Sequence, residues 1–203
     1  MKLVAVSQRV DVIPEYDERR DSLDQSWIKF LSACNFSPLL IPNNKVCAAN
    51  LVVNTPLSGI VLTGGNDLVA YGGNAQERDE TENFILQYAL DKKIPLLGVC
   101  RGMQIIQHFY GVELTKIQGH VDTKHDLMID GSLIRVNSYH NFGATETKNP
   151  LEVWATSEDG VIEAVRHNFA SVTGVMWHPE RNKTFEKYDI SLVKKLFDSN
   201  PMR

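Results

Sequence analysis

The sequence predicts an α/β domain of three layers, with a mostly parallel central sheet covered by helices on both faces. Short apolar runs typical of buried strands alternate with segments whose apolar residues recur at helical spacing. From about Leu133 to Trp177 the pattern changes to strands joined by short turns, which predicts an antiparallel extension. The length of 203 residues fits one domain covering 1–203.

Four apolar runs are expected to form the parallel strands, because strands buried on both faces are apolar along their whole length. These runs are Leu3–Val6, Leu39–Ile41, Ile60–Leu62 and Leu96–Val99. Apolar side chains three or four positions apart predict helices over 23–34, 84–89 and 192–197. Cys34 shares the spacing of the first helix and is therefore expected in the core.

Composition favours a small-molecule partner. The formal net charge is −4 and basic runs are absent, which argues against general nucleic-acid binding. The first apolar run is interrupted by Gln8, Arg9 and Asp11, so we expect neither a signal peptide nor a membrane span, and a cytoplasmic location. Three cysteines without paired spacing do not suggest disulfides. A homo-oligomer remains open.

The segment Leu96–Gln104 joins an apolar strand to a helix through a cysteine flanked by glycines. In such a strand–turn–helix the central side chain stands above the sheet, and Gly98 and Gly102 leave room for the turn. Because the helix begins near Arg101, its free N–H groups favour the thiolate of Cys100. We predict that Cys100 is a presented nucleophile and not a buried core cysteine, which is the alternative.

The segment Val172–Glu180 carries a histidine and an acid two positions apart. If the segment is extended, His178 and Glu180 face the same side, so that the carboxylate holds one imidazole nitrogen while the other faces the sulfur. Pro179 stiffens the turn between them. A surface turn is the alternative for these residues alone, but together with Cys100 they predict a Cys–His–Glu triad.

A pair of glycines follows the strand in Ile60–Asp67. The backbone N–H of Gly65, together with that of Arg101, would form an oxyanion hole for acyl transfer. A glycine pair after a strand is most often only a turn, so this interpretation depends on the neighbouring motifs.

These segments resemble the class I glutamine amidotransferases, and within that family the free-standing γ-glutamyl hydrolases. The resemblance rests on Gly64–Asp67, Arg78–Asp79 with Glu82, Gly98–Gln104, Val136–His140 and Trp177–Glu180, in family order. It implies a flavodoxin-like sheet with an antiparallel extension and a reaction without a cofactor. Met176 stands where the family usually has glutamine. Asn141–Phe142 replace the His-Gln common in the hydrolase branch, which leaves the substrate open.

The expected substrate-binding residues are Gly64, Gln104, Ser138, Tyr139, His140 and Arg9. The resemblance implies that the polar segment ending at His140 holds the glutamyl amino and carboxylate groups. His140 is also a rival base, but His178 is preferred because an adjacent acid orients it. Gln104 lies one helical turn beyond Cys100, within reach of a substrate, unless it occupies a solvated face. Arg9 is placed to meet an anionic leaving group, although pairing with Asp11 is favoured.

No metal site is expected. His120 and His125 lie near Asp122 and Asp126, but their spacing matches no strong metal-binding pattern, and no Cys-x-x-Cys pair accompanies them.

The predicted function is hydrolysis of a γ-glutamyl amide, with release of glutamate and an amine. One alternative is a glutaminase subunit that delivers ammonia to a partner synthase. A second alternative is a catalytically silent binding module, which is disfavoured because Cys100, His178 and Glu180 are all present.

Overall fold

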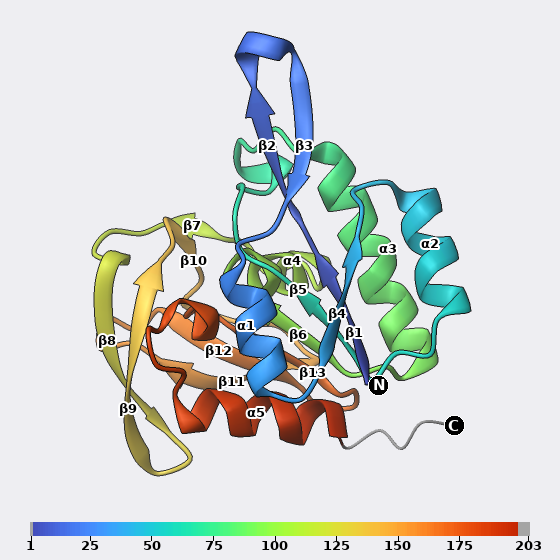
Figure 1. Cartoon of the computed structure of the whole chain (residues 1–203). Helices are drawn as coiled ribbons and strands as arrows, with labels where there is room; N and C mark the ends of the chain where they lie inside the picture. Colours follow the sequence, from blue (N-terminus) through green and yellow to red (C-terminus); the bar gives the residue numbers. More distant parts are fainter. Residues whose placement is uncertain (1, 199–203) are drawn as a thin grey trace.

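The computed structural model describes residues 2–198 and contains a seven-stranded sheet. Its strands are β1 (Leu3–Ser7), β4 (Ser37–Ile41), β5 (Gly59–Leu62), β6 (Leu96–Val99), β11 (Leu151–Thr156), β12 (Ile162–His167) and β13 (Val172–Val175). They lie in the order β11-β12-β13-β6-β5-β1-β4 (Figure 1). The five strands from β13 to β4 are parallel, whereas β12 pairs antiparallel with both of its neighbours, β13 and β11.

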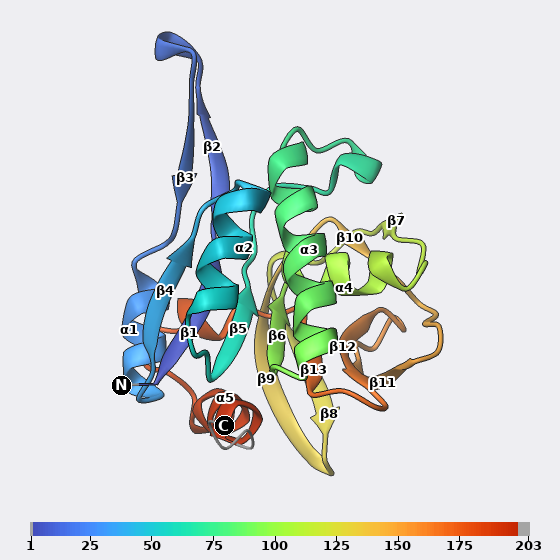
Figure 2. The ribbon, with the colours of Figure 1, turned by 90° about the vertical axis from the view of Figure 1, so that its right-hand side faces the viewer.

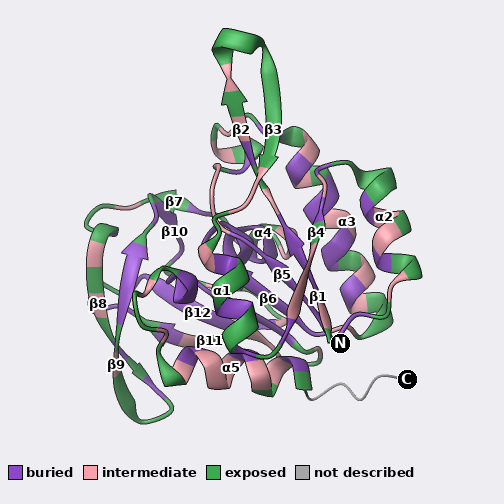
Figure 3. Cartoon of the chain, in the orientation of Figure 1, coloured by how far each residue is buried: buried purple, intermediate pink, exposed green. Residues whose placement is uncertain are grey.

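Helices cover both faces of this sheet. They are α1 (Ser26–Ala33), α2 (Lys45–Asn54), α3 (Gln76–Lys92), α4 (Arg101–Phe109) and α5 (Lys187–Asp198). Neighbouring strand residues pack on opposite sides: Ala5 contacts the core under α2, α3 and α4, and Val4 and Val6 contact the core under α1 and α5 (Figure 2). The central strands are buried between these layers (Figure 3). The predicted three-layer α/β fold is confirmed.

Among residues 2–198, three two-stranded sheets lie outside the main sheet. They are β2 (Arg9–Ile13) with β3 (Glu18–Ser22), β7 (Thr115–Lys116) with β10 (Phe142–Gly143), and β8 (Val121–Ile129) with β9 (Ser132–Tyr139). The β2–β3 hairpin continues past the carboxyl end of β1 and projects from the body of the protein (Figure 1). Short 3₁₀ helices span Pro14–Tyr16, Val69–Tyr71 and Pro179–Arg181. Within residues 2–198, no helix has the length and apolar character needed to cross a membrane.

The antiparallel region differs in its bounds from the sequence prediction. It begins at Val121, before the expected Leu133, with the β8–β9 hairpin. β13 falls within the predicted antiparallel stretch but pairs in parallel with β6. The reason is that β12 and β13 run antiparallel to each other, so the turn between them returns the chain to the direction of the parallel strands.

The turn between β6 and α4 depends on two glycines. A Cβ atom added at Gly102 would lie 2.0 Å from the carbonyl oxygen of Leu62 in β5, and one at Gly98 would lie 2.4 Å from the carbonyl oxygen of Gly102. Both oxygens belong to the backbone, so a side chain could not be accommodated by rotamer changes. The start of α4 therefore approaches β5 closely only because these positions lack side chains.

We predict that Gly102→Ala lowers the free energy of unfolding by about 1–3 kcal/mol, since overpacking forces the backbone to shift. Gly119→Asn is the control: Gly119 has a φ of 81° and open space around it, and asparagine tolerates that conformation. Urea denaturation measures both variants. A Gly102→Ala variant no less stable than the control would contradict the close approach of α4 to β5.

Candidate active site

Three adjacent strands each end at a predicted functional group. β13, β6 and β5 are neighbours in the sheet. Beyond their carboxyl ends lie His178, Cys100 and the Gly64–Gly65 pair, respectively. Because parallel strands end at a common edge, these residues from distant parts of the chain come together there.

Cys100 occupies the turn between β6 and α4 with φ 53° and ψ −107°. This is a strained backbone conformation for a residue with a side chain. Its N–H donates to the carbonyl of Val175 at 2.8 Å, which ties the turn to β13. The side chain is 6% exposed, so the expectation that Cys100 is not buried is wrong. It lines a cavity of about 220 Å³ but is largely enclosed, because Gly64 and His178 lie against it.

His178 lies between Cys100 and Glu180. Its Nδ1 is 2.7 Å from a carboxylate oxygen of Glu180, and the ring also makes a hydrogen bond with Cys100. The expected extended segment is only partly correct. β13 ends at Val175, and Glu180 lies in the 3₁₀ helix that begins at Pro179, so a tight helical turn brings the acid to the imidazole.

Charges at this site favour an ionised thiol. Burial alone raises the pKa of Cys100, but the charge and hydrogen bond of His178 outweigh it, so this pKa lies below its ordinary value. Burial alone lowers the pKa of His178, but the negative charges of Cys100 and Glu180 raise it to about 9. The backbone N–H of Arg101 also hydrogen-bonds Cys100, as expected at a helix N-terminus. The arrangement shifts the proton from the thiol towards the imidazole and so favours a thiolate–imidazolium pair.

The β9 segment contributes one residue that the sequence analysis missed. Asn137 exchanges two hydrogen bonds with the backbone of His178, both of 2.8 Å, and so holds the histidine in place. The adjacent Ser138 donates its hydroxyl to the carbonyl of His120 and does not line the cavity, contrary to its predicted position. Successive residues of a strand face opposite sides, so Ser138 lies away from the cavity that Tyr139 lines.

Most of the other predicted substrate-binding residues line the cavity around Cys100. Its lining consists of Gly65, Asn66, Asp67, Cys100, Arg101, Gln104, Tyr139, His140 and Asn141. Gln104 is buried, and its amide donates to the carbonyl of Phe142 at 2.9 Å, so it does not occupy a solvated face. His140 Nδ1 lies 3.0 Å from the same carbonyl. These contacts fix two polar side chains in the cavity wall.

Arg9 pairs with Asp11, as the favoured alternative predicts. Its Nε lies 2.7 Å from Asp11, and its side chain also packs on Gly65, where an added Cβ would meet Arg9 Cβ at 3.2 Å. With Gly64 and His178 it lines a second cavity of about 50 Å³. Arg181 also lines this cavity and was not identified from the sequence.

The Arg101 side chain does not face a substrate. It is 1% exposed and pairs with Asp79 and Glu82. Glu82 also pairs with Arg78 at 2.9 Å, and Arg78 in turn donates to the carbonyls of Thr63, Gly64 and Gly65. This buried ion network, Arg78–Asp79–Glu82–Arg101, therefore holds the glycine turn beside the first residue of α4.

The protein is thus an α/β protein in which a cysteine at a strand–helix turn lies beside a histidine, and the histidine in turn contacts a glutamate. Residues 18–196 match the family model of class I glutamine amidotransferases. The chain belongs to this family.

Relatives and solved structures agree with this assignment. Over 96% of both chains, the protein is 30% identical to the gamma-glutamyl-CDP-amidate hydrolase of Campylobacter jejuni. It is 31% identical to the gamma-glutamyl-gamma-aminobutyrate hydrolase of Escherichia coli over 68% of each chain. Its fold matches that of a putative GMP synthase subunit from Thermoplasma acidophilum with a TM-score of 0.72 and 19% identity, over 98% of this chain and 93% of that one.

We predict that iodoacetamide alkylates Cys100 much faster than Cys34 at pH 7. Burial raises the pKa of Cys34 to about 12, so its thiol stays protonated, whereas the lowered pKa of Cys100 increases its ionised fraction. Peptide mass spectrometry measures both rates, with exposed Cys47 as the internal control for active reagent. A Cys100 rate that falls roughly 25-fold between pH 9 and pH 7, as for a thiol with an ordinary pKa of about 8.5, would contradict the ion pair.

Proposed function

We propose that the protein hydrolyses a γ-glutamyl amide bond, with Cys100, His178 and Glu180 as the catalytic triad. The observation that carries the proposal is the position of His178, which contacts Cys100 on one side and Glu180 on the other. The two hydrolase relatives named above support the reaction class.

In the proposed reaction the thiolate of Cys100 attacks the γ-carbonyl carbon. The backbone N–H groups of Gly65 and Arg101 stabilise the resulting oxyanion. When the carbon–nitrogen bond breaks, protonated His178 gives its proton to the leaving amine and a glutamyl thioester remains. Neutral His178 then takes a proton from water, whose oxygen attacks the thioester, and glutamate leaves as the thiolate reforms. Glu180 holds the tautomer and orientation of the imidazole throughout.

For the substrate we propose a γ-glutamyl conjugate with an anionic leaving group, specifically γ-glutamyl-CDP-amidate, in capsule biosynthesis. The relative from Campylobacter jejuni that spans nearly the whole chain supports this choice. The second cavity supports it on chemical grounds, because Arg9 and Arg181 both line it next to Gly64 and Gly65. Two guanidinium groups suit a diphosphate better than they suit ammonia or a small neutral amine.

A screen of γ-glutamyl conjugates, with glutamine included and scored by glutamate release, tests the proposed reaction. The proposal requires turnover by the protein alone. Turnover of glutamine only when a synthase is added would instead favour the ammonia-delivering role. That alternative is supported by similarity to the glutamine-hydrolysing GMP synthase subunit of Methanococcus maripaludis, at 28% identity over 72% of this chain and 77% of that one.

We predict that Cys100→Ala abolishes turnover while substrate binding persists, since the covalent step needs the sulfur and binding uses other groups. Intact-mass analysis after rapid quenching should show a glutamyl adduct on the wild-type protein and none on the variant. Calorimetric titration checks that the variant still binds substrate. Full activity of Cys100→Ala would exclude the mechanism.

We predict that Arg9→Ala lowers kcat/KM for the nucleotide conjugate. The corresponding loss of transition-state stabilisation should be on the order of 1–3 kcal/mol, the value of a hydrogen bond to a charged group. Cleavage of a small neutral γ-glutamyl amide should change much less. Arg20→Ala is the matched control, because Arg20 lies on the projecting hairpin and pairs with Glu18. Equal losses on both substrates would contradict an anionic leaving group at Arg9 but leave the γ-glutamyl hydrolase reaction intact.

A further inference from the structure

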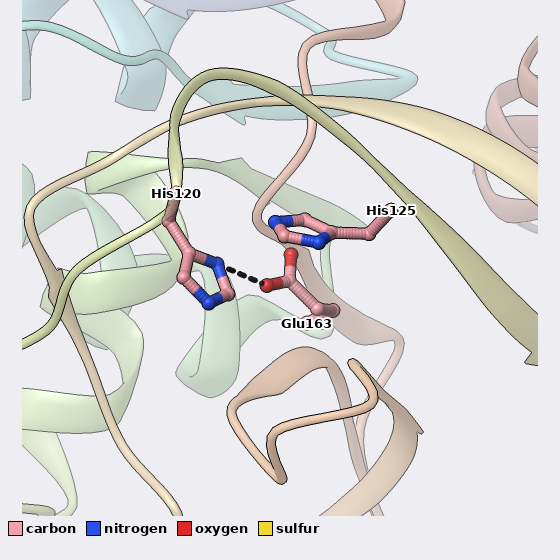
Figure 4. Close-up of side chains that lie close together, drawn as sticks. All are labelled: His120, His125 and Glu163. Carbon is pink, nitrogen blue, oxygen red and sulfur yellow. Dashed lines mark ion pairs between the residues drawn. The ribbon is translucent and has the colours of Figure 1, made fainter.

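A second cluster of polar side chains lies apart from the triad. His120 precedes β8, His125 lies on β8 and Glu163 lies on β12 (Figure 4). Each offers one ligand atom, and these atoms all lie within 4.8 Å of one another. His120 and Glu163 are fully buried, and His125 is half-buried.

Several buried polar atoms of this cluster have no hydrogen bond of good geometry among residues 2–198. They are His120 Nδ1, His125 Nε2, His140 Nε2 and both carboxylate oxygens of Glu163. A buried carboxylate without hydrogen bonds costs several kcal/mol, so a favourable partner for Glu163 is required. The nearest groups are His120 Nδ1 and His140 Nε2, at 3.1 Å and 3.4 Å from the same carboxylate oxygen.

The contacts of His120 and His140 on the side away from Glu163 determine which nitrogen of each neutral ring carries the hydrogen. His120 Nε2 lies 3.0 Å from the carboxylate of Asp159, which can only accept a hydrogen bond, so in the neutral ring the hydrogen is on Nε2. His140 Nδ1 faces the carbonyl of Phe142 at 3.0 Å and carries the hydrogen of that ring. In the neutral rings, both nitrogens that face Glu163 therefore present lone pairs to a carboxylate. Such an arrangement is repulsive unless one of the rings is protonated or a cation lies between them.

We propose that His120, His125 and Glu163 bind a zinc ion, with His140 Nε2 as the fourth donor. Ligands about 2.0–2.1 Å from a tetrahedral zinc ion lie roughly 3.3 Å apart, which is close to the two separations given above. Imidazole nitrogens with one carboxylate suit zinc. The Asp159–His120 contact matches the carboxylate that commonly fixes the tautomer of a metal-binding histidine. The spacing of His120 and His125 predicted no metal, because Glu163 is distant in the sequence.

This site is distinct from the triad but reaches the same cavity. An ion there would join the segment before β8, the strand β8 and the strand β12. Through His140, which lines the cavity around Cys100, it would also fix part of the wall that faces the substrate. The ion would take no part in the proposed acyl transfer.

Zinc binding is tested first with Cys100→Ser, because a catalytic thiolate can itself bind zinc. The chelator-treated variant is dialysed against buffered zinc, and bound metal is measured by elemental mass spectrometry. We expect one equivalent of zinc and a melting temperature that rises with free zinc concentration. Failure to bind zinc tightly, with no change in melting temperature, would overturn the proposal and indicate that protons neutralise the cluster.

Variants then locate the ion. In the Cys100→Ser background, Glu163→Gln and His125→Ala should each lose zinc and its stabilising effect. His108→Ala is the control and should retain both, because His108 is an exposed histidine on α4 outside the cluster. Since half-buried His125 is less critical for folding than Glu163, a folded His125→Ala variant that still binds one equivalent would overturn the assignment. Anomalous scattering at the zinc edge should place the ion between His120 and Glu163.

Discussion

The buried ion network Arg78–Asp79–Glu82–Arg101 is the constraint on which the geometry around Cys100 depends. Arg78 binds the carbonyls of the glycine turn after β5, and Glu82 links it to Arg101, the residue that follows Cys100. Desolvating these charges costs about as much as their attraction returns, so the network is poor evidence for stability. Its physical effect is positional: it fixes the direction of the backbone N–H groups at Gly65 and Arg101 relative to the sulfur.

A second constraint acts on the imidazole. Asn137 holds the backbone of His178 with two hydrogen bonds, while Glu180 holds its side chain. Because Asn137 lies on β9, outside the main sheet, the β8–β9 hairpin contributes to the site as well as covering the core. The same hairpin carries His125, so the cluster around Glu163 and the position of His178 depend on one structural element.

The sequence was sufficient where the signal is local. The strand, glycines and helix around Cys100 are contiguous, and their spacing predicted the observed turn. It was insufficient where contacts join distant segments: nothing near His120 or His125 indicates that Glu163 on β12 lies beside them. The β2–β3 hairpin was missed because its residues are mostly polar and exposed, and Val10 is the one buried residue of its two strands. Ser138 was assigned to the cavity because a motif gives positions but not the side of the strand that each residue faces.

Because β13, β6 and β5 are neighbours in the sheet, the distances between the groups at their ends can change little among related proteins. Neighbouring strands in a sheet are about 4.8 Å apart, and that spacing is set by main-chain hydrogen bonds that no side-chain substitution alters. The spacing of the strands therefore sets the distances between the imidazole of His178, the sulfur of Cys100 and the Gly64–Gly65 turn. Adaptation to a larger or smaller substrate must then occur in the appended segments, above all the hairpin that begins at Arg9, while the reacting groups keep their distances.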